Sequence, residues 1–395
     1  MSLVLEQRLC ASIARLGIAV RPMAGDLDAF FRKHIGTILR AAFPETASTA
    51  TSLFVRDYLV PNFEAQLRVL REACSDADVL VAPWLHHAAS AAAEVAGVPW
   101  VTLVYSPIVI PSAYFTAYPP FRRLPRRLWM PANRFTWALG KRMFGSILDD
   151  PVNALRARFG LPRRRHLAHE GSLSPHLTCA AITRALVQRP PDWPVDIEVT
   201  GFCFWDTPAD WQPSPALEKH LQDGRPLVAI YFGSMAAEPF TLLYRTAVDA
   251  ALRAGVRTIV LGISEDALGD YDRDRVLATK FAPFSAVFPF CRAAIHHGGI
   301  GTAARVLQAG LPSLVVPWGY DQFATAMMLD DAGATRSLPA RRMSVTAATR
   351  SLEALLAGEH HRTAAAAIQR AIIAEDGPRT LADAIESRAL RIGCR

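Results

Sequence analysis

Apolar residues in the first half of the chain occur in short runs that alternate with stretches of helical spacing. Residues 1–5, 17–23 and 99–105 have the apolar character of strands, and residues 61–75 place apolar side chains three and four positions apart. Pro61 suits the first turn of that helix, where its missing N–H is not needed. Strands that alternate with helices predict a parallel sheet covered on both faces.

A second alternation begins near residue 226. The nearly continuous apolar strand PLVAIYFGS ends at Gly233 and Ser234, and the spacing predicts a helix over about 239–254. Later strands are expected at VRTIVLG, AAIHHGG and PSLVVP, with a helix after each of the last two and helical spacing near the C-terminus. The second half therefore also predicts an α/β domain.

The length of 395 residues agrees with two domains. Prolines concentrate in residues 189–226, which we interpret as the linker region. We expect a first domain over 1–205 and a second over 216–395. Residues 111–135 are rich in proline, aromatic residues and arginine, and we expect an irregular loop there that contributes to an acceptor pocket or faces a membrane.

The formal net charge of +7 comes from local clusters of arginine. No nucleic-acid-binding module or aromatic interleaving accompanies these clusters, so nucleic acid is not an expected partner. A solvated basic face and a weak attraction to an anionic membrane surface both remain as interpretations. The arginines are Arg122, Arg123, Arg126, Arg127, Arg156, Arg158, Arg163, Arg164 and Arg165.

The six cysteines are scattered and form no CxxC pair, which suits a reducing compartment better than a disulfide framework or a zinc site. The N-terminus has no basic leader with an apolar core, and no run reaches the length that spans a bilayer. We expect a cytoplasmic protein, with peripheral contact at the inner membrane as a further expectation.

The most informative segment is residues 293–322, AAIHHGGIGTAARVLQAGLPSLVVPWGYDQ. An apolar strand ends at the two histidines, three glycines follow, and a helix begins near Thr302. Glycines allow close backbone approach to a ligand, and the N–H groups and dipole of a helix N-terminus bind anions. A diphosphate is the natural ligand, with Thr302 adding a hydroxyl. The glycines are Gly298, Gly299 and Gly301.

Strand alternation limits the roles of the two histidines. Neighbouring strand residues face opposite sides, so we expect only one of His296 and His297 to reach the ligand, and the pair is a poor metal site. Asp321 and Gln322 follow the next strand, at the edge where ligands bind in open α/β sheets. A carboxylate and an amide there suit sugar hydroxyls, although Asp321 could instead be a helix N-cap.

The segment FAPFSAVFPFCRAAIHHGGIGTAARVLQAGLPSLVVPWGYDQ resembles the donor motif of the GT1 family, the UDP-glycosyltransferase-like proteins of GT-B fold. The resemblance covers nearly the whole chain and implies two Rossmann-like domains facing across a cleft. It implies a UDP- or dTDP-sugar as co-substrate, with neither a cofactor nor a metal. The implied contacts are the base with Phe281 and Ala282, the diphosphate with Gly233, Ser234, His297, Gly299, Gly301 and Thr302, and the sugar with Asp321 and Gln322.

Within that family the central stretch is most similar to a bacterial branch that includes a rhamnosyltransferase of rhamnolipid synthesis. The similar pieces are PSAYFTAYPPF, PVNALRARFGLP and DWPVDIEVTGFCFWD. This likeness implies a hydrophobic or lipid-like acceptor.

The N-terminus departs from the family pattern. Family members begin with a strand, a glycine-containing turn and a helix, and the catalytic base or its partner comes from that turn. The present sequence matches what usually follows, so we expect a βα unit of about 30 residues to be missing, and with it a central strand. The family's base corresponds to none of His34, His86 and His87, and the catalytic residues remain unknown.

The sequence therefore predicts an inverting glycosyltransferase that moves a hexose to an acceptor hydroxyl. One alternative is a nucleotide-sugar-binding protein of low or no activity that acts as partner of a complete enzyme. A GT-B sugar epimerase is disfavoured, because no paired carboxylates suited to epimerisation are recognisable.

Overall fold

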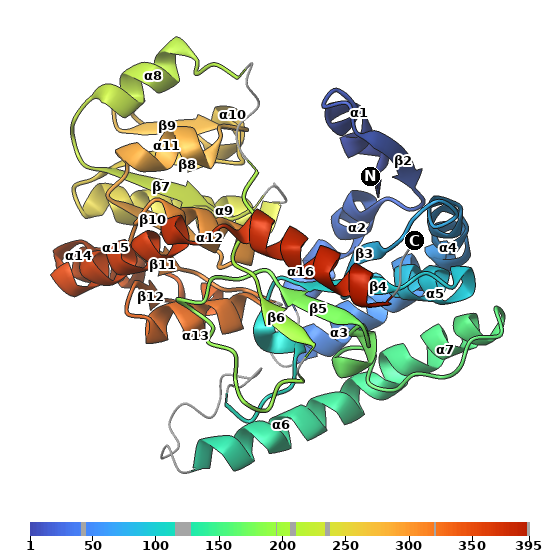
Figure 1. Ribbon diagram of the computed structural model, residues 1–395. Coiled ribbons are helices and arrows are strands. Elements are labelled where there is room, and N and C mark those ends of the chain that lie inside the picture. The colour runs from blue at the N-terminus through green and yellow to red at the C-terminus, as the bar shows by residue number, and fades with distance from the viewer. Residues whose placement is uncertain are drawn as a thin grey trace. The chain divides into compact units, whose positions relative to one another are not determined.

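The chain is divided into two compact units (Figure 1). The computed structural model describes residues 1–40, 45–114, 128–194, 196–205, 211–233, 238–319 and 321–392. Unit 1 comprises Met1–Ile182, Gln188–Gly201 and Gly377–Arg395, and unit 2 comprises Thr183–Val187 and Phe202–Asp376. The chain thus passes to unit 2 near the expected linker, but its last segment, expected in the second domain, packs with unit 1.

Unit 1 is built of parallel strands and helices. Its strands are β1 (Ser2–Glu6), β2 (Ala19–Met23), β3 (Leu80–Pro83), β4 (Trp100–Val104), β5 (Leu177–Ala180) and β6 (Ile197–Val199). Its helices are α1 (Gln7–Ala14), α2 (Leu27–Arg40), α3 (Glu45–Phe54), α4 (Val60–Ala73), α5 (His87–Ala96), α6 (Trp129–Phe144), α7 (Asp150–Ala157) and α16 (Gly377–Ile392). The early strands and the helix at 61–75 are confirmed, and Pro61 lies in the first turn of α4.

The strands of unit 1 form two separate sheets. One pairs β1 with β2, and the other has the order β3-β4-β5-β6. Helix α4 lies beneath both sheets, because Val4 of β1 and Leu80 of β3 pack against the same core as Phe63 and Leu67 of α4. The expectation that the first domain lacks a central strand stays a prediction.

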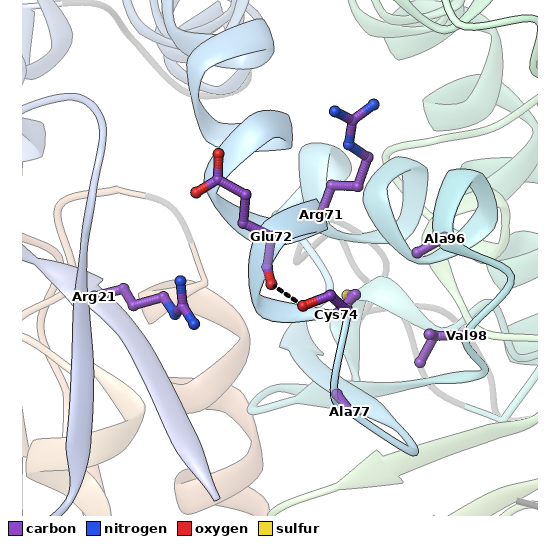
Figure 2. A pocket seen from close by; sticks show the side chains of 8 residues that line it. Arg21, Arg71, Glu72, Cys74, Ala77, Ala96 and Val98 are labelled. Carbon is purple, nitrogen blue, oxygen red and sulfur yellow. Dashed lines mark hydrogen bonds between the residues drawn. The ribbon is translucent and has the colours of Figure 1, made fainter.

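A hollow of about 690 Å³ lies beside the two-stranded sheet (Figure 2). Arg21 of β2 lines one side, and Arg71 and Cys74 at the end of α4 line another. Ala77 and Val98, which precede β3 and β4, complete it. The hollow therefore opens where these two strands begin, at the edge opposite to the one where open α/β sheets bind ligands.

Two expectations for the middle of the chain are corrected. Residues 129–135, expected to be irregular, form the start of α6, and the rest of the expected loop over 115–127 lies outside the described residues. The expected linker 189–226 contains β6 and a helix, and β6 pairs with β5 as part of unit 1. Proline content alone therefore overestimated the irregular structure.

Unit 2 holds one parallel sheet of order β12-β11-β10-β7-β8-β9. Its core joins strand residues such as Ile259 and Ala294 to Val306, which lies on a helix. The strands are β7 (Leu227–Tyr231), β8 (Arg257–Leu261), β9 (Val276–Thr279), β10 (Ala293–His296), β11 (Ser313–Val315) and β12 (Thr335–Ser337). The helices are α8 (Pro215–Gln222), α9 (Glu238–Arg253), α10 (Glu265–Leu268), α11 (Phe284–Val287), α12 (Ile300–Gln308), α13 (Gln322–Asp331), α14 (Val345–Ala357) and α15 (Glu359–Ala374).

Candidate donor site

The expected donor residues of unit 2 gather at one edge of its sheet, where the parallel strands end. Segments that follow β7, β9, β10 and β11 all reach this carboxyl edge, and β7 and β11 both pair with β10. Gly233 follows β7, and Phe281 and Ala282 follow β9. His297 to Thr302 follow β10, and Asp321 and Gln322 follow β11. Ser234 lies outside the described residues. The topology thus brings together residues that lie up to 89 positions apart in the chain, from 233 to 322.

The two histidines at the end of β10 have different surroundings. His296 is buried, its Nδ1 accepts the Gly298 N–H at 3.1 Å, and its Nε2 lies 3.2 Å from the Ser313 hydroxyl. Since Nδ1 is the acceptor, Nε2 carries the proton and donates to Ser313. Burial, with a smaller effect of His297, lowers the pKa of His296 to about 3, so the ring is neutral. His296 is therefore a structural residue that holds the turn.

We expect His296→Ala to lower the free energy of unfolding of unit 2 by about 2–4 kcal/mol. The change removes a buried ring and leaves the Gly298 N–H without its acceptor. Urea unfolding at neutral pH measures the loss. Ser313→Ala, which removes only the hydroxyl partner, should cost about 1 kcal/mol. Equal losses in the two variants would contradict this role of the ring.

His297 faces away from that core and is partly exposed. Its buried Nδ1 has no hydrogen-bond partner among the described residues. Burial lowers the pKa of His297 to about 4, against a smaller opposing effect of a hydrogen bond with the backbone of Tyr231. The ring is therefore neutral near pH 7. The two histidines thus differ in burial, and that only His297 reaches a ligand stays a prediction.

The glycine turn after His297 leaves no room for side chains at Gly298 and Gly299. Gly298 has φ +90°, and a Cβ there would lie 2.9 Å from Val315 Cγ1. A Cβ on Gly299 would lie 2.5 Å from the Nε2 of His297, whereas one on Gly301 would meet nothing within 4 Å. The first-turn N–H groups of α12 lack intrahelical acceptors, and the N-cap residue Gly299 has no side chain to bond them. Free N–H groups at a helix N-terminus can bind an anion.

Asp321 and Gln322 begin the neighbouring helix, α13. Asp321 occupies the N-cap position, as the alternative interpretation stated, but its side chain makes no capping hydrogen bond. Burial raises the pKa of Asp321 to about 6. The Gln322 Oε1 accepts the N–H groups of Trp318 and Gly319 at 3.0 and 3.2 Å. Gln322 therefore shapes the loop after β11, and its amide oxygen is already used.

Phe281 and Ala282 follow β9 and differ in exposure. The Phe281 side chain is 63% exposed, which is unusual for a large apolar residue, while Ala282 is buried. The Phe281 carbonyl accepts the Thr279 hydroxyl at 3.1 Å, which fixes the local turn. An exposed aromatic ring above a rigid turn can stack on a nucleobase.

Tyr244 is a positioning residue that the sequence did not indicate. It comes from α9 and is buried, and its hydroxyl accepts the Phe232 N–H at 3.0 Å. The same hydroxyl is 3.2 Å from the Gly233 carbonyl and 3.0 Å from that of Leu261. Tyr244 thereby holds the segment that follows β7. No local motif marks it, because its partners are backbone groups from two other strands.

Unit 1 contains a histidine–carboxylate pair that the sequence also did not indicate. His34 Nε2 of α2 lies 2.9 Å from Asp57 Oδ2, and the His34 side chain is only 8% exposed. Hydrogen bonding from Arg56 is the main reason that the pKa of Asp57 falls to about 2, so the carboxylate is ionised. A carboxylate beside an imidazole is the arrangement that orients a general base.

Two structural facts concern metals and membranes. Within the described ranges, histidine, cysteine, aspartate and glutamate side chains form no group of three or more that could hold a metal ion. In the same part of the chain, no helix has the length and apolar character needed to cross a bilayer.

Comparison with solved structures defines the class of fold. The spinosyn rhamnosyltransferase solved with thymidine diphosphate matches with a TM-score of 0.65 at 17% identity, covering 98% of this chain and all of that one. The calicheamicin glycosyltransferase matches with a TM-score of 0.64 at 18% identity, covering 98% and 90% of the two chains. The chain therefore has the GT-B fold.

Sequence comparison finds similar glycosyltransferases. Residues 257–387 match the C-terminal domain described as erythromycin biosynthesis protein CIII-like. An O-mycaminosyltylonolide 6-deoxyallosyltransferase of Streptomyces fradiae is 35% identical over 57% of this chain and 53% of its own length. A sterol 3-beta-glucosyltransferase of Yarrowia lipolytica is 28% identical over 91% of this chain. The chain is therefore similar in sequence to these glycosyltransferases, and it has the GT-B fold.

The matched relatives are longer proteins. The chain spans about half of the Streptomyces fradiae relative and a quarter of the Yarrowia lipolytica one.

Proposed function

We propose that this protein transfers a hexose from a UDP- or dTDP-sugar to a hydroxyl of a hydrophobic or lipid-like acceptor, with inversion at the anomeric carbon. The observation that carries the proposal is the turn between β10 and α12, where Gly298, Gly299 and the free N–H groups of α12 would form an anion site. A solved relative of the same fold is described with thymidine diphosphate, which supports a diphosphate ligand here. Relatives named for glycosylation of sterols and of a tylonolide support an apolar acceptor.

In this proposal the residues around the turn stabilise the leaving diphosphate. The α12 N–H groups and Thr302 would donate to its oxygens, and His297 would add a neutral donor. Such groups are already oriented before the reaction, so they stabilise the developing negative charge without rearrangement. Phe281 would stack on the base, Asp321 would accept sugar hydroxyls, and the amide nitrogen of Gln322 would donate to one. Gly233 would approach the phosphates from the end of β7, and Tyr244 would hold the segment that contains Gly233.

The direct test is transfer of labelled sugar from a panel of UDP- and dTDP-sugars to sterol, macrolide and hydroxy-fatty-acid acceptors. Calorimetry with UDP and dTDP accompanies it. Binding with transfer supports the proposal, and absence of binding to either nucleotide would overturn it. Binding without transfer to any acceptor would favour the alternative, a nucleotide-sugar-binding partner protein, for which the divided sheet of unit 1 is the motivation.

Asp321 gives this site a predicted pH dependence. Its pKa is raised to about 6, so the carboxylate that accepts sugar hydroxyls forms only as the pH rises through that value. We expect affinity for the nucleotide sugar, relative to the bare nucleotide, to rise across pH 6 in the wild type and to stay flat in Asp321→Asn. Because the folded-state pKa lies above that of the unfolded chain, wild-type stability relative to Asp321→Asn should fall as the pH rises from about 4 to about 6 and should level off above that. Parallel profiles of the two proteins would contradict both expectations.

The pair formed by His34 and Asp57 is our candidate for the acceptor's general base. We expect His34→Ala to lower kcat by about 100-fold or more, since general-base catalysis contributes at least that much. Affinity for dTDP, measured by calorimetry, should not change. His86→Ala is the matched control, because His86 lies in the same unit without a carboxylate partner among the described ion pairs. Equal kcat values for the two variants would remove His34 from the mechanism.

A further inference from the structure

Helix α6 of unit 1 presents large apolar side chains to solvent. Phe135 and Leu139, one turn apart, are 64% and 55% exposed, and Leu128, Trp129 and Met130 at the start of the helix are 37–42% exposed. Large side chains of this kind are normally buried, and a group of exposed ones on one helix is typical of an interaction surface.

The opposite face of α6 is anchored in unit 1, so the exposed face is not free to turn inward. The Asn133 amide donates to the Ala113 carbonyl and the Trp137 indole donates to the Ser112 carbonyl, both at 2.9 Å. Both side chains are buried. These bonds fix the rotation of the helix about its axis, and Phe135 and Leu139 point outward as a consequence.

The three charged side chains of α6 are all cationic, and Lys141 among them pairs with Glu170. Arg134 and Arg142 on α6 are exposed. The sequence between Glu94 and Asp149 contains no aspartate or glutamate, although it contains seven cationic side chains. These are Arg122, Arg123, Arg126, Arg127, Arg134, Lys141 and Arg142. A partner that matches both features must combine an apolar layer with anionic groups.

We propose that the α6 surface, formed by Leu128, Trp129, Met130, Arg134, Phe135, Leu139 and Arg142, docks unit 1 on an anionic lipid bilayer. Apolar side chains of such a helix enter the boundary between headgroups and acyl chains, while arginines bind the anionic headgroups. Tryptophan is favoured at that same boundary. The inference rests on the proposed function in one respect, since docking would bring the enzyme to an acceptor that resides in the membrane.

The test is sedimentation of the full chain with vesicles of phosphatidylcholine alone or mixed with phosphatidylglycerol, at low and high salt. We expect binding to the anionic vesicles, weaker binding at high salt, and little binding to phosphatidylcholine alone. The variant Phe135→Ser/Leu139→Ser should lose binding by about tenfold or more. The control variant Leu242→Ser/Ile373→Ser removes two side chains of unit 2 that are 70% and 69% exposed, and it should bind like the wild type.

Three outcomes would overturn the inference. They are no binding of the wild type to anionic vesicles, equal binding by the α6 variant, or a wild-type dimer that this variant converts to a monomer, which would assign the surface to a second copy. Affinity for dTDP is measured on every variant. This affinity tests the proposed function independently of the membrane inference. A protein that binds dTDP but not vesicles contradicts only the membrane inference.

Discussion

Replacing Gly298 by alanine is expected to lower the affinity for dTDP and UDP by about 10- to 100-fold. The backbone at Gly298 has φ +90°, which a residue with a side chain adopts only with strain. The new Cβ would also lie 2.9 Å from Val315 Cγ1 and 3.1 Å from the Gln322 carbonyl oxygen. The turn must therefore shift, and with it the N–H groups at the start of α12 and the ring of His297.

Gly333→Ala is a matched control, because it introduces the backbone strain of a positive φ without a steric clash. Its φ is +77°, but a Cβ there would make an ordinary contact at 3.6 Å, with Ala364. Gly333→Ala should lower stability slightly and leave nucleotide affinity unchanged. Calorimetry gives the affinities, and urea unfolding separates loss of binding from loss of fold. If Gly298→Ala binds dTDP like the wild type, the turn is not the diphosphate site.

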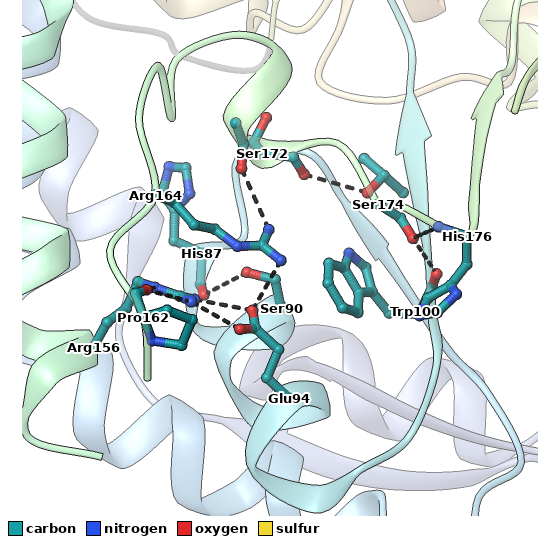
Figure 3. Close-up of polar contacts among 12 residues, drawn as sticks. His87, Ser90, Glu94, Trp100, Arg156, Pro162, Arg164, Ser172, Ser174 and His176 are labelled. Atoms are coloured by element: carbon teal, nitrogen blue, oxygen red, sulfur yellow. Dashed lines mark hydrogen bonds and ion pairs between the residues drawn. The ribbon is translucent and has the colours of Figure 1, made fainter. Parts of the chain in front are cut away.

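Replacing Glu94 by alanine is expected to destabilise unit 1 by about 3–5 kcal/mol. Glu94 of α5 accepts two hydrogen bonds, at 2.8 and 3.0 Å, from Arg156 of α7, whose side chain is only 1% exposed (Figure 3). Arg164 binds the same carboxylate at 3.1 Å and lies over the Trp100 ring. Loss of Glu94 leaves one buried and one mostly buried cation without their anion, and His87 beside them already has a pKa lowered to about 3, chiefly by burial.

Glu64→Ala is the control for this network. Glu64 pairs with Arg158, but both side chains are well exposed, so the change should cost less than about 1 kcal/mol. Urea unfolding followed by tryptophan fluorescence measures both variants. Affinity for dTDP should stay at the wild-type value in each, because neither residue belongs to unit 2. A Glu94→Ala loss as small as that of Glu64→Ala would show that the buried network does not stabilise the unit.

Elements with strong periodicity could be predicted from the sequence. The expected helix after the strand PSLVVP begins and ends where α13 does, at Gln322 and Asp331. Short strands of little apolar character were missed, such as β12 with the sequence TRS, because pairing with β11 rather than local preference makes it a strand. The place of α16 was missed too, since Leu381 and Ala384 pack against β4 and β5 residues from much earlier in the chain.

The candidate site shows the same division between local and non-local information. Strand alternation was sufficient to predict that one of the two histidines faces inward. The partner that fixes its tautomer, Ser313, belongs to the next strand and could not be read from the motif. The raised pKa of Asp321 depends on burial, which only the folded chain creates.

The division of the unit 1 sheet affects how the protein behaves in solution. Strands β1 and β3 each have one side without a neighbouring strand, so their backbone groups there depend on water for hydrogen bonds. A two-stranded ribbon gains little cooperativity, and its amides should exchange with deuterium sooner than those of β4 and β5. Open strand edges of this kind also promote self-association when the protein is concentrated, so low protein concentration should limit it in binding experiments.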